Sequence, residues 1–225
     1  MDFRDFAEPD APRAQPRSGA QRYYEQHAAE LAARYEGLSF PALYEDVVPF
    51  LPVPPAAVAD IGAGSGRDAA ALARLGFAVT AVEPVPAMRE TAVRLHPEEI
   101  VWLADALPEL ASVQGPFGLL LLSAVWMHLD RDERPPAMAR LGELLTEGGR
   151  LVITLRHGEP PHDRRMFDVP AAETVELAAA HGLFLLHRGG GEDRLGRDGV
   201  HWSQLVFEKR ARTTGAETAG PRRQA

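Results

Sequence analysis

The sequence predicts an α/β domain in which a mostly parallel sheet has helices on both faces. Strand-like and helix-like segments alternate along most of the chain, which is typical of βαβ units. The segment 117–122 (Phe-Gly-Leu-Leu-Leu-Leu) is almost entirely apolar, as expected for a central strand buried on both faces. A glycine-rich turn joins the strand at 58–61 to the helix that follows it. At 225 residues and 45% hydrophobic content, one such domain is the simplest expectation.

Helices are expected first near the N-terminus. A helix over Ala20–Tyr35 ends before Gly37, and its apolar face consists of Tyr24, Ala28, Leu31 and Tyr35. A second helical stretch is expected over 39–50, before the prolines that mark the entry to the main domain.

The main domain supplies the remaining elements. Strands are expected at 58–61, 77–82, 100–103, 117–122, 150–155, 183–186 and 202–207, with helices at 67–75, 84–95 and 134–145 and from near Pro170 to near His181. The glycine-rich connection 189–201 predicts that the last two strands form an antiparallel hairpin at the edge of the sheet.

The glycine-rich turn is the most informative feature of the chain. Residues 58–68 read Val-Ala-Asp-Ile-Gly-Ala-Gly-Ser-Gly-Arg-Asp, with glycines at alternate positions after Asp60. Glycine allows backbone conformations closed to other residues and lets a ligand approach the main chain. The free N–H groups of the following helix favour an acidic ligand group. A tight turn without a ligand is the alternative, but three alternating glycines beside an acidic strand end favour a nucleotide-sized ligand.

The glycine spacing separates two classes of ligand. A dinucleotide fingerprint starting at Gly62 requires a third glycine at position 67, where this chain has Arg67. The next strand ends at Glu83, whose carboxylate can accept hydrogen bonds from both hydroxyls of a ribose. The segments Asp60-x-Gly62-x-Gly64-Ser65-Gly66 and Val82-Glu83-Pro84 resemble the first two sequence motifs of the class I S-adenosylmethionine-dependent methyltransferases.

The resemblance covers roughly residues 55–209 and implies a three-layer Rossmann-like methyltransferase fold. Its seven-stranded sheet is mostly parallel, with an antiparallel last strand inserted beside the sixth. The expected divisions are flexible tails at 1–18 and 211–225, an N-terminal helical lid at 19–52 and a cofactor-binding domain at 53–210. The implied reaction is in-line methyl transfer from S-adenosyl-L-methionine to a small-molecule acceptor, which leaves S-adenosyl-L-homocysteine.

The resemblance also assigns residues to the cofactor. An acidic residue after the third strand typically faces the adenine amino group in this family, and Asp105 occupies that place, although a polar loop residue is the alternative there. Tyr23 lies off the apolar face of the first helix and is therefore expected to reach the cofactor from the lid. The full expected set is Asp60, Gly62, Ala63, Gly64, Ser65, Gly66, Arg67, Asp68, Glu83, Pro84, Met88, Asp105, Ala106, Ser123, Ala124 and Tyr23.

Three histidines are candidates for a general base, which a hydroxyl acceptor would need and a thiolate or free amine would not. They are His128, His157 and His201, and structural packing is the alternative for His128.

The polar loop 156–168 contains Arg156, Arg164 and Arg165, which could meet an anionic or polar acceptor or pair with neighbouring carboxylates. Its His157, His162 and Asp163 lack the spacing of a metal site, and no metal is expected.

Composition narrows the function classes. A net charge of -8 disfavours nucleic acid as a partner, and the absence of cysteine excludes disulfides and thiolate metal sites. No apolar run approaches the ~20 residues of a membrane span, and no signal peptide is recognisable, so a cytoplasmic enzyme, monomeric or homodimeric, is expected. Alanine and arginine usage is typical of a high-GC bacterial genome. A non-catalytic cofactor-binding module and a nucleotide-dependent oxidoreductase remain alternatives.

Overall fold

A seven-stranded mixed sheet forms the centre of the computed structural model, which describes residues 19–210. The tails expected at 1–18 and 211–225 lie outside the described residues. The strands are β1 (Ala57–Ile61), β2 (Ala78–Val82), β3 (Ile100–Leu103), β4 (Phe117–Leu122), β5 (Leu145–His157), β6 (Leu183–Glu192) and β7 (His201–Lys209). Their order is β3-β2-β1-β4-β5-β7-β6, and β7 runs antiparallel to both of its neighbours. The expected fold class and edge hairpin are therefore confirmed.

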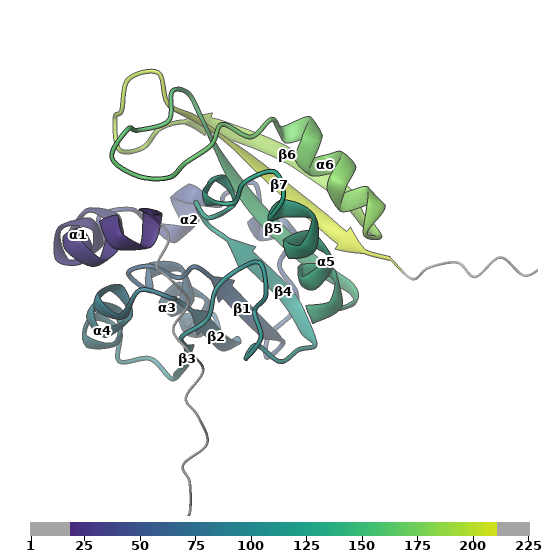
Figure 1. The fold of residues 1–225 in the computed structure, drawn as a ribbon. Coiled ribbons are helices and arrows are strands. Elements are labelled where there is room, and N and C mark those ends of the chain that lie inside the picture. The colour runs from purple at the N-terminus through teal and green to yellow at the C-terminus, as the bar shows by residue number, and fades with distance from the viewer. Residues whose placement is uncertain (1–18, 211–225) are drawn as a thin grey trace, which may run out of the picture.

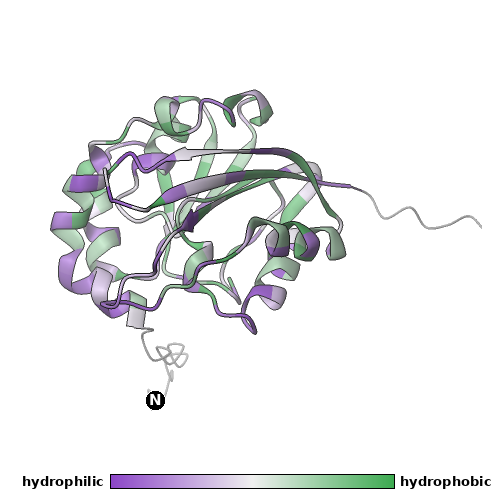
Figure 2. Ribbon diagram, turned by 90° about the horizontal axis from the view of Figure 1, so that it is seen from above, coloured by the Kyte–Doolittle hydropathy of each residue, from purple (hydrophilic) through white to green (hydrophobic). Residues whose placement is uncertain are grey.

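Helices cover both faces of this sheet (Figure 1). They are α1 (Gly19–Glu36), α2 (Phe40–Leu43), α3 (Arg67–Arg74), α4 (Pro86–Leu95), α5 (Arg134–Leu144) and α6 (Ala171–Ala180), with short 3-10 turns η1 (Val48–Phe50) and η2 (Trp126–His128). In Figure 1, α5 and α6 lie on one side of the sheet and α3 and α4 on the other. Figure 2 shows hydrophobic residues mainly on the inner strands and hydrophilic ones mainly on the peripheral helices and loops.

The apolar strand β4 joins the two cores of the domain. Leu120 and Leu122 belong to the core under α5 and α6, whereas Leu119 and Leu121 belong to the core under α2 and α3. Successive side chains of a strand point to opposite faces, so an uninterrupted apolar run serves both cores. This arrangement confirms the interpretation of 117–122 as a central strand.

The stretch 39–50 differs from the single helix that was expected. Helix α2 ends at Leu43, and a separate 3-10 turn begins at Val48. Proline in a helix interior removes a hydrogen bond and restricts the residue before it, so Pro49 is incompatible with one continuous helix. The break leaves Tyr44, which is 2% exposed, free to point into the domain.

Strand β5 is longer than the expected 150–155. It begins at Leu145, directly after α5, and its pairing with β4 is irregular between Phe117 and Leu119. Gly148 in this irregular part has a φ of 73°, which glycine adopts readily. At its other end, β5 extends to His157 and pairs with β7 as far as His201. This extension carries Arg156 beyond the parallel part of the sheet.

Helix α1 packs on α4 rather than directly on the sheet. Ala28 of α1 forms a small apolar cluster with Val85 and Met88, and Tyr24 and Tyr35 pack against this cluster. The contact holds α1 near the carboxyl ends of the strands (Figure 1), where open α/β sheets bind ligands.

Candidate active site

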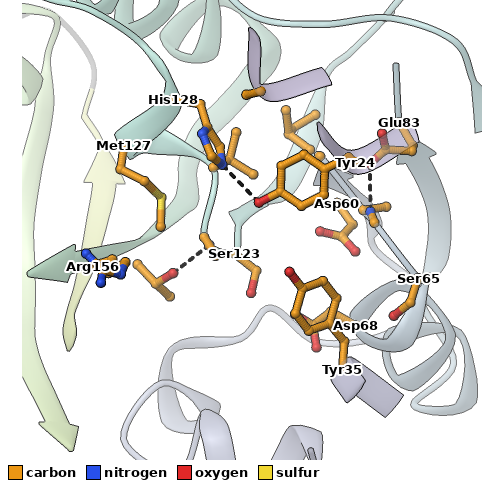
Figure 3. Close-up of a pocket in the computed structure, with 18 of the residues that line it drawn as sticks. Tyr24, Tyr35, Asp60, Ser65, Asp68, Glu83, Ser123, Met127, His128 and Arg156 are labelled. Atoms are coloured by element: carbon orange, nitrogen blue, oxygen red, sulfur yellow. Dashed lines mark hydrogen bonds between the residues drawn. The ribbon is translucent and has the colours of Figure 1, made fainter. Parts of the chain in front are cut away.

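A cavity of about 1470 Å³ lies where β1, β2 and β4 end and α1 covers the edge of the sheet. Single-ligand sites usually enclose about 300–1000 Å³. The cavity therefore has room for more than one small molecule. All of its lining residues belong to one cavity. We call the part around Asp60, Gly62, Gly64, Glu83 and Asp105 the glycine-turn half, and the part around His128, Arg156, Arg164 and Trp202 the hairpin half; Tyr24 packs against Val85 and Met88 and contacts His128 of the hairpin half. Figure 3 shows Arg156 and Glu83 on opposite sides of this space.

The glycine turn brings backbone atoms to the cavity wall. Gly62 has a φ of 74°, and an added Cβ would lie 2.5 Å from Cγ2 of Val125. Gly64 has a φ of 57°, and its N–H donates to Oε2 of Glu83 at 2.8 Å. Residues with a side chain rarely adopt such φ values, so glycine at 62 and 64 lets the turn fold back against the end of β2.

Asp60 presents a buried carboxylate to the cavity. The residue is 1% exposed, and neither side-chain oxygen has a hydrogen-bond partner among the described residues. Burial, followed by the negative charge of Asp68, raises its pKa well above the usual value, although the nearby Ala69 amide acts in the opposite direction. Buried polar atoms are nearly always paired, so these oxygens fit a cationic or hydrogen-bond-donating ligand.

Glu83 is held at the end of β2 by backbone amides. Its Oε1 accepts a hydrogen bond from Val85 N–H and its Oε2 accepts one from Gly64 N–H, both at 2.8 Å. Burial raises its pKa to about 7. A carboxylate has about four lone-pair positions, so two remain for hydroxyl donors such as those of a ribose.

Asp105, in the loop after β3, also lines the glycine-turn half of the cavity. Its Oδ1 accepts a hydrogen bond from Ala106 N–H at 2.8 Å, and its Oδ2 accepts bonds from the N–H and hydroxyl of Ser112 at 2.7 and 2.6 Å. These contacts fix the loop after β3. Met88 of α4, 1% exposed, lines the same part of the cavity.

The floor of the cavity is a polar network around Tyr44, which sequence reasoning missed. The Tyr44 hydroxyl lies 2.9 Å from Asp68 Oδ2 and 2.6 Å from Ser123 Oγ. Arg67 donates to both oxygens of Asp68 at 2.7 and 2.8 Å, and to the Tyr35 carbonyl at 3.3 Å. The network links α1, α3 and β4. A single tyrosine directly after a short helix carries no sequence signal for this role.

Two of the residues expected at the cofactor do not line the cavity. Gly66 precedes α3, and a Cβ there would lie 2.9 Å from the His96 ring and 3.0 Å from the Trp102 ring, so this glycine allows close packing. Tyr23 stacks on His27 with 4.4 Å between ring centroids, and the Arg164 guanidinium lies 4.3 Å from its ring centroid. All other residues of the expected set line the cavity.

Tyr24 takes the place that was expected for Tyr23. The face of α1 that packs on α4 also borders the cavity, so the apolar stripe does not point away from the ligand space. Periodicity identifies the buried face of a helix but does not distinguish a packed core from a cavity wall.

His128 is the one base candidate among the three that lines the cavity. Its Nδ1 lies 2.9 Å from the Arg165 carbonyl, which can only accept, so Nδ1 carries the proton. Its Nε2 is therefore the acceptor for the Tyr24 hydroxyl at 3.2 Å (Figure 3). Burial lowers the pKa of His128, which favours the neutral ring, and burial raises the pKa of Tyr24.

His157 and His201 lie side by side at the ends of β5 and β7. Their ring centroids are 4.9 Å apart, and Nε2 of His157 is 2.9 Å from Ser203 Oγ. Neither is among the residues that line the cavity. Within 19–210, no group of three or more His, Asp or Glu side chains could hold a metal ion. In the same range, no helix is long and apolar enough to cross a bilayer.

The sequence is similar to those of known methyltransferases. A family model described as a methyltransferase domain matches residues 58–149. An uncharacterized methyltransferase of Bacillus licheniformis is 33% identical over 96 residues, which are 43% of this chain and 45% of that protein. The match thus spans less than half the length of that relative.

Solved structures match over most of the chain. A TehB-like S-adenosylmethionine-dependent methyltransferase from Corynebacterium glutamicum is 25% identical, with a TM-score of 0.64, covering 84% of this chain and 98% of that one. The Burkholderia thailandensis 1,6-didemethyltoxoflavin-N1-methyltransferase, solved with 1,6-didemethyltoxoflavin and S-adenosylhomocysteine, is 24% identical with a TM-score of 0.59, covering 93% and 99%. Together with the turn at Asp60–Gly66 and the strand order, these similarities show that residues 58–149 match a methyltransferase domain and that the chain has the fold of the class I S-adenosylmethionine-dependent methyltransferases.

Proposed function

We propose that the protein transfers the methyl group of S-adenosylmethionine to a small-molecule acceptor that binds in the hairpin half of the cavity. One observation carries this proposal. The same cavity of about 1470 Å³ holds the acidic groups that suit the cofactor and a separate set of polar side chains at its other end. A site for a single ligand usually encloses no more than about 1000 Å³, which is about two thirds of this volume.

Three carboxylates support the assignment of the glycine-turn half to the cofactor. Asp60, with two unpaired buried oxygens, would hold the cationic methionine part. Glu83 would accept hydrogen bonds from the ribose hydroxyls, and Asp105 would lie at the adenine. Because Asp60 lies near the end of β1 and Glu83 and Asp105 follow β2 and β3, the sheet backbone fixes the distances between the three carboxylates.

Bound S-adenosylmethionine supplies a methyl group on a positively charged sulfur, which an in-line nucleophile can displace. The remaining task of the protein is to orient the acceptor and exclude water. Orientation of this kind contributes several kcal/mol, up to about 7–11 kcal/mol in ideal cases. Tyr24 and the rest of α1 cover the cavity and suit the exclusion of water.

His128 is the residue that we propose for proton removal when the acceptor is a hydroxyl. Its Nε2 is the hydrogen-bond acceptor, and burial keeps the ring neutral by lowering its pKa. A positioned base contributes about 10²–10⁴-fold to such reactions.

The test combines binding with transfer. S-adenosylhomocysteine is titrated calorimetrically into the protein, and radiolabelled S-adenosylmethionine is then incubated with the protein and a fractionated bacterial small-molecule extract. We expect binding and label transfer to at least one fraction of small molecules. Binding without transfer to any fraction would indicate a non-catalytic cofactor-binding module, and preferential binding of NAD would indicate an oxidoreductase.

A further inference from the structure

Arg156 is a buried guanidinium with incomplete pairing. The residue is 8% exposed and lies in the extension of β5, opposite Trp202 of β7. Its Nη1 donates to the carbonyls of Gly158 and Glu159 at 3.2 and 3.1 Å. Its Nε is buried and has no hydrogen-bond partner among the described residues. A buried charge of this kind costs several kcal/mol when unpaired, so a ligand that pairs with it is the simplest reason for its position.

A second guanidinium adds to the positive field. Arg164 also has a buried Nε without a partner, and its ion pair with Asp163 is long, at 3.5 Å, and involves a carboxylate that is 53% exposed. Burial, followed by the charges of Arg197 and Arg164, lowers the pKa of Arg156, while the carboxylates of Asp193 and Asp168 act in the opposite direction. Both Arg156 and Arg164 line the hairpin half of the cavity.

Two other arginines that line the cavity are neutralised by carboxylates, whereas Arg194, which also lines it, is exposed. Arg197 pairs with Asp193 through Nη2 and Nε at 2.5 and 3.0 Å, and Trp202 Nε1 donates to the same carboxylate. Arg165 pairs with Asp130 at 2.5 Å and with Glu133 at 2.7 Å. The alternative that loop charges pair among themselves therefore holds for Arg165, whereas Arg156 makes no ion pair with a carboxylate within residues 19–210.

From this arrangement we infer that the methyl acceptor bears a carboxylate, which binds Arg156 in the hairpin half of the cavity. The inference rests on the proposed function, because it takes the acceptor to bind there. Nη1 is held by the loop carbonyls, so the plane of the guanidinium is fixed and its Nε side is left for the ligand. A planar guanidinium matches a planar carboxylate through two parallel hydrogen bonds.

The charges and apolar groups around Arg156 narrow the ligand further. Asp193 and Glu192 line the same half of the cavity and weaken the field for a doubly charged phosphate more than for a singly charged carboxylate. Met127 and Trp202, which line the same cavity, supply apolar surface for the body of the ligand. An apolar small molecule with one carboxylate fits these groups.

The test uses matched probes on the protein loaded with S-adenosylhomocysteine. Benzoate, benzamide and phenylphosphonate are titrated calorimetrically, since they share a ring and differ in charge. We expect benzoate to bind at least about tenfold more tightly than benzamide, because a hydrogen bond to a charged group contributes about 1.5–3 kcal/mol. Equal affinities, or no measurable binding of benzoate, would overturn the inference, and a preference for phenylphosphonate would replace the carboxylate with a phosphate. This comparison needs no variant, so it does not depend on how a substitution folds.

Variants then locate the site. Arg156→Gln is expected to bring benzoate within about twofold of benzamide, and Arg156→Lys to keep part of the preference, because lysine retains the charge without the planar fork. Arg165→Gln is the matched control, since carboxylates already neutralise Arg165 and the preference should persist. A preference that survives Arg156→Gln would refute the assignment to this residue.

The result of the benzoate and benzamide titrations does not depend on whether methyl transfer is observed. Arg156→Gln should leave the affinity for S-adenosylhomocysteine within about twofold, because Arg156 lies across the cavity from Glu83 (Figure 3). Failure of wild-type protein to bind S-adenosylhomocysteine, or to transfer label, would contradict the proposed function, whereas the benzoate preference reports on the anion site alone.

Discussion

The glycine-turn half and the hairpin half of the cavity differ in how the chain builds them. The glycine-turn half comes from the ends of adjacent parallel strands, β1, β2 and β3, and its acidic groups are held by short backbone contacts. The hairpin half is assembled from α1, the end of β5, the loop after β5 and the β6–β7 hairpin. Its contacts join residues far apart in sequence, such as Tyr24 and His128.

From this difference we infer that cofactor binding is the fixed part of the function and acceptor binding the variable part. Strand ends of a parallel sheet give a rigid frame for a ligand that every relative with the same chemistry must bind. Loops and an added helix can change without disturbing that frame. We therefore expect substitutions in the glycine-turn half to act on cofactor affinity, and substitutions in the hairpin half to act on the acceptor and its proton.

The largest effect is expected from Gly62→Ala. The added Cβ meets Val125 at 2.5 Å and the φ of 74° becomes strained, so the turn must move away from the cofactor. We expect the affinity for S-adenosylhomocysteine to fall at least about 100-fold and the free energy of unfolding to fall by about 1–3 kcal/mol. Titration calorimetry and chemical denaturation measure the two quantities. Gly148→Ala is the matched control, because Gly148 has a φ of 73° and nothing within 4 Å of an added Cβ. If both variants lost the same cofactor affinity, backbone strain at a positive φ would explain the loss, and the contact of the added Cβ with Val125 would not be needed.

Asp60→Asn is expected to weaken cofactor binding less than Gly62→Ala does, and to raise the free energy of unfolding instead of lowering it. The amide removes a buried charge whose oxygens have no hydrogen-bond partner within residues 19–210, so the free energy of unfolding should rise by about 1 kcal/mol or more near neutral pH. It also removes the negative charge that suits the cationic methionine part, so affinity for S-adenosylmethionine should fall about 10–100-fold. Denaturation without ligand and calorimetry with it test both. A variant that is less stable and binds normally would mean that Asp60 is structural.

The sequence predicted the glycine-turn half well because its signals are local. Asp60, Gly62 and Gly64 lie within one strand and turn, and Glu83 closes the next strand, so spacing alone orders them. The seven strands also followed from residue periodicity and the edge hairpin from the glycine-rich connection 189–201, and the structure confirms them. The end of α2 before residue 50 was predictable in principle, because Pro49 disfavours one continuous helix over 39–50.

The hairpin half could not be predicted in the same way. Tyr24 and Tyr44 have ordinary positions in helical segments, and only tertiary contacts turn them toward the cavity. The loop arginines were recognised as candidates, but which of them lacks a carboxylate partner depends on distances between segments. Gly66, which belongs to the turn motif, packs against Trp102 instead of the cavity, because packing and binding both require a small residue.

The third prediction concerns pH: the ionisation of Glu83 should change the free energy of unfolding and the cofactor affinity in opposite directions. Burial raises its pKa from 4.5 to about 7, so the folded state holds this proton more tightly than the unfolded chain. The stability from this group is fully present below the unfolded pKa and is lost as pH rises through about 7. Cofactor affinity should change in the opposite sense, because the ionised carboxylate is the form that we propose to accept hydrogen bonds from the ribose. Below pH 7, affinity for S-adenosylhomocysteine should fall by at most about tenfold per pH unit.

The comparison with Glu83→Gln isolates this group from the other carboxylates. Denaturation and calorimetry between pH 5 and 8 should show a pH-dependent difference between wild type and variant, and the variant should bind the cofactor weakly at every pH. A difference that does not change across this range would show that Glu83 does not titrate there.

The smallest effect is expected in the hairpin half, from Tyr24→Phe. The Tyr24 hydroxyl donates to Nε2 of His128 at 3.2 Å and so stabilises the neutral ring, and its removal should raise the pKa of His128. The loss corresponds to one hydrogen bond, about 0.5–1.5 kcal/mol. NMR titration of the histidine ring measures the shift without any acceptor. Tyr23→Phe is the matched control, because the Tyr23 ring contacts His27 and Arg164 and should leave the His128 titration unchanged. A larger shift in Tyr23→Phe than in Tyr24→Phe would return the role at the cavity to Tyr23. A shift confined to Tyr24→Phe, with cofactor affinity nearly unchanged, would show that proton control belongs to the hairpin half and is separable from cofactor binding.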